Sequence, residues 1–125
     1  MESSPAATPP PIVSSEDKVL AIACHLSFLI GGLGFLILPL VIYLVKRETS
    51  VFVSFHAREA LNFHLSLLLY SICTIPLFFL LACFFIILIP IYAAIGIFAL
   101  ICAILAAVRA SESVYYQYPL SIRLV

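Results

Sequence analysis

Residues 60–108 read ALNFHLSLLLYSICTIPLFFLLACFFIILIPIYAAIGIFALICAILAAV, and no Asp, Glu, Lys or Arg occurs among them. A charged side chain near the centre of a bilayer costs roughly 2.5–3.5 kcal/mol, and one membrane-spanning helix needs about twenty apolar residues. This stretch is therefore long enough for two spanning helices joined by a tight turn. A second charge-free stretch, from Val19 to Val45, has room for a third. The sequence predicts an integral membrane protein.

The predicted fold is an all-α bundle of three transmembrane helices within a membrane domain at 18–125. The spans are expected at about 19–45, 54–80 and 84–110, with the last turn near Ala82 and Cys83 and an interfacial C-terminal tail at 111–125. Three glycines lie in the middle of the first span, so a helix broken at Gly31–Gly34 is the alternative.

Composition excludes several other classes of protein. The chain is 65% hydrophobic and 10% charged, with a mean hydropathy of +1.26, far from the averages of soluble domains. The formal net charge is zero, so nucleic acid is not an expected partner. Residues 1–17 are rich in Pro and Ser, which predicts a disordered tail. This tail lacks the basic and apolar regions of a cleaved signal peptide.

The basic residues predict how the three spans are oriented. With three crossings, the first loop and the C-terminal tail share one side of the membrane, and five of the six basic residues fall there. The positive-inside rule makes that side cytoplasmic. The N-terminus is then expected outside. The five residues are Lys46, Arg47, Arg58, Arg109 and Arg123.

A polar stripe enters the second predicted span. On a helix, Glu59, Asn62 and Ser66 share one face, with His56 at its edge and Arg58 beside Asn62. Polar groups at this depth must face protein or water, and they are functional candidates by default. In the alternative, interfacial interpretation, Arg58 and His56 reach toward the membrane surface, and Glu59 pairs with a basic residue of the loop or the C-terminal tail.

A metal site is the sharper alternative for these residues. His56, Glu59 and His64 would supply ligands together with His25 of the first span. However, their spacing is not that of HExxH, and two of the histidines diverge on a helix. The four cysteines form no CxxC pair. We therefore expect no metal, no cofactor and no catalytic residue.

Small residues repeat along one side of the third predicted span. Such a seam lets helices approach closely in lipid, where no hydrophobic force drives them together. The contact is expected either within one chain or between copies. The seam consists of Gly96, Ala99, Ala103, Ala106 and Ala110.

Several short blocks resemble a family of small prokaryotic membrane proteins of unknown function, which is similar to the twenty-kilodalton subunit of the chloroplast Tic import translocon. The blocks are His25–Ser27, Pro39–Leu40, Lys46–Ser50, Phe52–Val53, His56–Phe63 and Tyr118–Arg123. The resemblance implies a multi-pass protein of a prokaryotic plasma (inner) membrane and a link to protein translocation. It implies no catalytic residues.

Three functions follow from these features. The first is a non-enzymatic membrane interaction module, linked to translocation or assembly, whose partners are the lipid bilayer and other membrane proteins or further copies of itself. The alternative is a small oligomeric channel or transporter lined by the polar stripe. An intramembrane metalloenzyme built on the histidines and Glu59 is the third.

Overall fold

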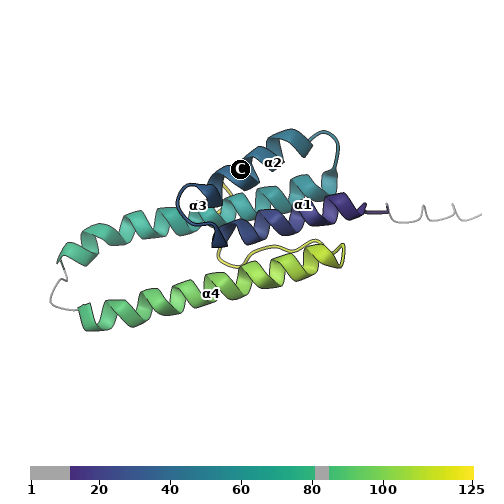
Figure 1. The fold of residues 1–125 in the computed structure, drawn as a ribbon. Coiled ribbons are helices and arrows are strands. Elements are labelled where there is room, and N and C mark those ends of the chain that lie inside the picture. Colours follow the sequence, from purple (N-terminus) through teal and green to yellow (C-terminus); the bar gives the residue numbers. More distant parts are fainter. Residues whose placement is uncertain (1–11, 81–84) are drawn as a thin grey trace, which may run out of the picture.

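The computed structural model describes residues 12–80 and 85–125, which form α-helices, a single 3₁₀ turn and extended segments (Figure 1). In chain order the elements are α1 (Ser15–Leu26), η1 (Ser27–Leu29), α2 (Gly34–Lys46), α3 (Val51–Leu80) and α4 (Phe85–Ser111). The predicted all-α class is confirmed for these residues. Most of the predicted disordered tail, and the turn predicted near Ala82 and Cys83, lie outside the described residues.

Helix α1 begins inside the segment predicted as a disordered tail. The Ser14 side chain accepts a hydrogen bond from the backbone N–H of Asp17 at 3.1 Å, which caps the helix. Glu16 and Asp17 lie in the first turn, where carboxylates interact favourably with the helix dipole. The tail prediction therefore extended too far, because these polar residues start a helix.

The first charge-free stretch forms a helical hairpin. Gly31 and Gly32 adopt φ values of +69° and +54°, a left-handed conformation that favours glycine. They reverse the chain, so α2 runs back along α1 (Figure 1). The open end of the hairpin is closed by an ion pair in which Lys46 Nζ lies 3.0 Å from Glu16 Oε1. One continuous span over 19–45 does not form; the broken-helix alternative does.

Within residues 12–80 and 85–125, two helices are long and apolar enough to cross a membrane, namely Val51–Leu80 and Ile86–Ser111. Helix α2 has 13 residues and a length of about 20 Å, shorter than the roughly 30 Å hydrocarbon core of a bilayer. The predicted first span, at 19–45, is therefore not confirmed as a membrane crossing. The second and third predicted spans correspond to α3 and α4.

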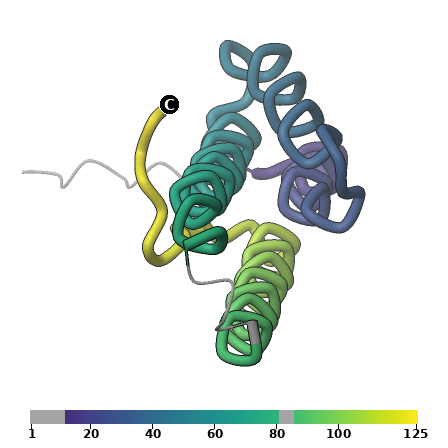
Figure 2. Tube along the Cα trace, turned by 90° about the vertical axis from the view of Figure 1, so that its left-hand side faces the viewer, coloured from purple at the N-terminus to yellow at the C-terminus, as the bar shows by residue number. Residues whose placement is uncertain are grey.

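The hairpin and the C-terminal tail lie on different sides of α3 (Figure 2). Helix α4 packs mainly against α1 and only sparsely against α3. At the interface of α1 and α4, Ala21 and Cys24 cluster with Ala110. Small side chains let these helices approach closely.

The charged side chains of the described residues gather at one end of the molecule. The start of α1, the end of α2, the start of α3 and the end of α4 meet there (Figure 1). Ion pairs at this end include Lys46–Glu16 and Arg109–Glu112. The described N-terminal and C-terminal segments therefore lie at the same end. The predicted three crossings, and the outside N-terminus that depends on them, are therefore not confirmed.

Candidate functional site

The polar stripe of α3 binds the chain's own C-terminal tail. We call Glu59, Asn62, Ser66 and Tyr70 the tail-binding stripe, and residues 118–125 the tail. The Glu59 side chain is only 1% exposed, and its Oε1 accepts a hydrogen bond from Arg123 Nη1 at 2.6 Å. Its Oε2 accepts one from the backbone N–H of Tyr118 at 3.4 Å. The buried carboxylate thus has a charged partner and a backbone donor, both from the tail.

Asn62 holds the backbone near the end of the tail. Its Oδ1 accepts hydrogen bonds from the N–H groups of Leu124 and Val125, at 3.0 and 2.8 Å, and its Nδ2 donates to the Val125 carbonyl at 3.3 Å. One amide side chain therefore satisfies three backbone groups. A tail without secondary structure needs such partners, because unpaired backbone groups are costly at membrane depth.

The deeper part of the tail is held by two hydroxyls. Ser66 Oγ accepts a hydrogen bond from the Ile122 N–H at 2.7 Å, and Tyr70 donates one to the Leu120 carbonyl at 3.0 Å. Leu120 has a φ of +58°, so the tail turns there and runs back toward the charged end. The tail is thus a short hairpin lying along α3.

Two histidines connect α1, α3 and the tail inside the protein. His25 Nδ1 lies 2.8 Å from the Tyr118 hydroxyl, and His25 Nε2 lies 2.9 Å from His56 Nδ1. Both histidines and Tyr118 are buried. Burial raises the pKa of Tyr118 above its usual range, so its hydroxyl stays protonated at neutral pH. The Tyr118 ring also stacks on Phe63, with ring centres 4.0 Å apart.

The structure gives no support to the metal alternative. Both ring nitrogens of His25 are already used in hydrogen bonds to Tyr118 and His56. Within residues 12–80 and 85–125, no three His, Cys, Asp or Glu side chains form a group that could hold a metal ion. His25 was missed as a structural residue, because its hydrogen-bond partners are 31 and 93 residues away in the sequence.

His64 stabilises the hairpin tip. Pro39 lies inside α2 and has no N–H, so it cannot bond the Phe35 carbonyl four residues earlier. His64 Nδ1 lies 2.7 Å from that carbonyl oxygen, and Ser27 Oγ donates to it at 3.3 Å. His64 therefore replaces the backbone donor that Pro39 removes, and its Nδ1 carries the proton.

We expect His64→Leu to lower the free energy of unfolding by about 1–3 kcal/mol, the usual cost of leaving a buried polar group unpaired. His64→Gln should be close to wild type, because its amide still donates to Phe35. Thermal unfolding in detergent measures both variants. In a Pro39→Ala background the cost of His64→Leu should shrink, since alanine supplies the missing backbone N–H. An equal cost in both backgrounds would contradict this role.

The remaining predicted residues lie in two places. Arg58 is exposed on α3, and no ion pair involves it within the described part of the chain. Four alanines of the predicted seam are buried within the chain, each with at most 1% of its surface exposed, whereas Gly96 is exposed. The buried part of the seam is therefore occupied by contacts within one chain. Its members are Ala99, Ala103, Ala106 and Ala110.

Comparison with known proteins corrects the family resemblance. No curated protein and no solved structure matches this chain. One family model matches residues 16–125, and it is not the Tic-related family. Several residues of the blocks that suggested that family, such as Glu59, Asn62 and Tyr118, hold the tail against α3. The chain belongs to the MamF/MmsF family, the magnetosome magnetite crystal formation protein family.

Proposed function

We propose that the protein is a non-enzymatic component of the magnetosome membrane that supports magnetite crystal formation by holding other membrane proteins in place. The observation that carries this proposal is the division of the molecule into two halves. The start of α1, the end of α2, the start of α3 and the end of α4 meet at one end of the molecule (Figure 1). Ion pairs such as Lys46–Glu16 and Arg109–Glu112 form in these segments, and no Asp, Glu, Lys or Arg occurs from Ala60 to Val108. In a protein of this kind, the apolar half anchors the molecule in the membrane, and the charged half is available to bind other proteins.

The chemistry of the polar stripe favours a structural role. Glu59, Asn62 and Ser66 bond to the tail, and His25 and His56 bond to each other. A catalytic group needs free access to a substrate, with a nucleophile or base in reach of it. These buried groups are instead used to hold the protein together.

Charge distribution orients the anchored protein. Because α3 and α4 cross the membrane and the α1–α2 hairpin returns to its starting end, all six basic residues lie on one side. The positive-inside rule makes that side cytoplasmic. The first and the last described segments of the chain both lie on it.

A partner surface at the charged end includes Arg58. Its guanidinium is exposed, and arginine is enriched in protein interfaces because its planar head makes several directed hydrogen bonds. The neighbouring pair Arg47–Glu48 is also exposed, with side chains 53% and 81% accessible. We infer that acidic or polar segments of another membrane protein bind at this end.

The channel alternative has weaker support. A pore needs polar side chains that face a continuous water path. Glu59, Asn62 and Ser66 face the tail, and beyond Thr74 the described part of α3 carries only apolar side chains.

The proposal is tested with Arg58→Glu in a magnetite-forming bacterium that lacks the native gene. We expect the variant to insert normally, to lose co-purifying membrane proteins, and to yield crystals smaller than those of the wild-type complement, measured by electron microscopy. Reversing a charge in an interface weakens binding, because like charges that face each other cost several kcal/mol.

Arg58→Lys is the matched control. This variant should keep the co-purifying membrane proteins and should yield crystals of wild-type size. Full-sized crystals together with unchanged co-purification in Arg58→Glu would overturn the partner surface. A purified homo-oligomer that conducts ions in liposomes would favour the channel instead. The same strains test the orientation, because protease added to sealed magnetosomes should remove tags placed at either end of the protein.

A further inference from the structure

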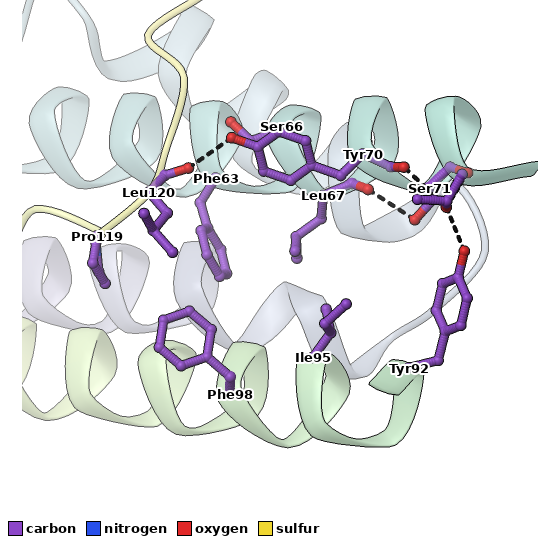
Figure 3. A pocket seen from close by; sticks show the side chains of 11 residues that line it. Phe63, Ser66, Leu67, Tyr70, Ser71, Tyr92, Ile95, Phe98, Pro119 and Leu120 are labelled. Carbon is purple, nitrogen blue, oxygen red and sulfur yellow. Dashed lines mark hydrogen bonds between the residues drawn. The ribbon is translucent and has the colours of Figure 1, made fainter. Parts of the chain in front are cut away.

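We infer that a groove between α3, α4 and the tail binds one acyl chain of a membrane lipid, taken from the leaflet at the charged end of the protein. The groove encloses about 260 Å³. Figure 3 shows side chains from all three segments turned toward it. It is bounded by Phe63 and Leu67 of α3, Ile95 and Phe98 of α4, and Pro119 and Leu120 of the tail.

The groove exists because α3 and α4 contact each other only sparsely. Helix α4 packs mainly against α1, so little of its surface reaches α3. The tail covers one side, where the Leu120 carbonyl accepts a hydrogen bond from Tyr70. At the deep end, Tyr92 of α4 donates a hydrogen bond to the hydroxyl of Thr74 on α3. Hydrogen bonds therefore fix two boundaries of the groove, the tail side and the deep end.

The lining is suited to hydrocarbon. Its hydroxyl groups donate their hydrogens within the protein: Ser71 bonds the Leu67 carbonyl at 2.8 Å, and Thr74 bonds the Tyr70 carbonyl at 3.0 Å. Tyr70 and Tyr92 are also used, as described above. No charged side chain lines the groove among the residues that the structure describes. A polar ligand would find few donors here, whereas a chain of methylene groups fits the apolar walls.

The position of the groove identifies the leaflet. Along α3 it extends from Phe63 to Thr74, a rise of about 16 Å at 1.5 Å per residue. Half of a bilayer's hydrocarbon core is about 15 Å thick. Phe63 lies close to the charged end, and Thr74 lies deeper in the charge-free stretch. The groove thus spans the depth of one leaflet, beginning at the charged side.

The attraction must come from packing. Lipid tails are as apolar as leucine, so no hydrophobic force drives an acyl chain from the bilayer into the groove. An acyl chain in the groove makes dispersion contacts with the walls on several sides at once. If the groove stayed empty, the side chains that line it would lose these contacts. We therefore expect selective retention of a lipid through detergent exchange.

The test compares retained lipid in the full-length protein and two variants, after reconstitution in phosphatidylcholine vesicles and extraction in mild detergent. Ile95→Phe fills the groove. Ile97→Phe adds the same volume at a 60% exposed position nearby on α4 and is the matched control. Native mass spectrometry should find one bound lipid on the wild type and on Ile97→Phe. Ile95→Phe should retain on the order of three-fold less, because the added ring displaces the chain's dispersion contacts.

Two outcomes would overturn the inference. Equal lipid retention in all three proteins would mean that the lipid is bound elsewhere. A dimer that loses its second subunit in Ile95→Phe would mean that another copy of the chain occupies the groove. If circular dichroism shows that Ile95→Phe is misfolded, Ser71→Leu fills the groove from the α3 side and gives the same comparison.

Discussion

Replacing Arg123 with methionine is expected to lower the free energy of unfolding by about 2–3 kcal/mol and to release the tail. The Glu59 carboxylate is 1% exposed and accepts its charged hydrogen bond from Arg123. Removing one partner of a buried ion pair costs about 3–5 kcal/mol. Arg123 itself is 51% exposed, so part of its charge is already solvated and the cost is smaller.

Thermal unfolding in detergent measures the stability, and chymotrypsin cleavage after Leu120 reports the release of the tail. Arg109→Met is the matched control, because Arg109 pairs with Glu112 at the surface and such a pair contributes only about 0–1 kcal/mol. Adding Glu59→Gln to Arg123→Met should restore part of the loss, since it removes the uncompensated charge. If Arg123→Met and Arg109→Met lowered the free energy of unfolding equally, the Arg123–Glu59 pair would contribute no more than a surface ion pair.

His25→Phe is expected to lower the free energy of unfolding by about 2–4 kcal/mol. The substitution keeps an aromatic ring in the core but removes both hydrogen bonds of His25, to Tyr118 and to His56. Each buried polar group left without a partner costs about 1–3 kcal/mol. The loss should appear as a lower unfolding temperature together with looser attachment of the tail.

A double-mutant cycle separates this explanation from simple loss of packing. Tyr118→Phe removes a hydroxyl that His25→Phe would leave unpaired, so the double variant should cost less than the sum of the two single variants. Tyr115→Phe is the matched control, because Tyr115 is 50% exposed. Strict additivity of His25→Phe and Tyr118→Phe would contradict the hydrogen-bonded connection.

The tail-binding stripe shows how much of a site can be predicted from the sequence. Helical spacing alone puts Glu59, Asn62 and Ser66 on one face, and the structure has them on one face of α3. The interfacial alternative included a pairing of Glu59 with a basic residue of the C-terminal tail, and Arg123 is that residue. What the stripe binds was not predicted, because the backbone groups of the tail have no signature in the sequence.

The family assignment failed for a related reason. Motif blocks such as residues 56–63 and 118–123 are rich in residues that bond α3 to the tail. Such blocks report that two segments pack together. They do not report what the protein does in the membrane, so a resemblance based on them pointed to the wrong family.

The sequence by itself determined the elements that depend on local composition. The charge-free stretch from Ala60 to Val108 accounts for most of the two long helices, because charged residues are excluded from the bilayer core. Tertiary structure decided what depends on distant partners. Gly31 and Gly32 permit a reversal, but the Lys46–Glu16 pair and the His64 bond to Phe35 hold the hairpin closed. Local patterns cannot encode these contacts, since their partners lie about thirty residues apart.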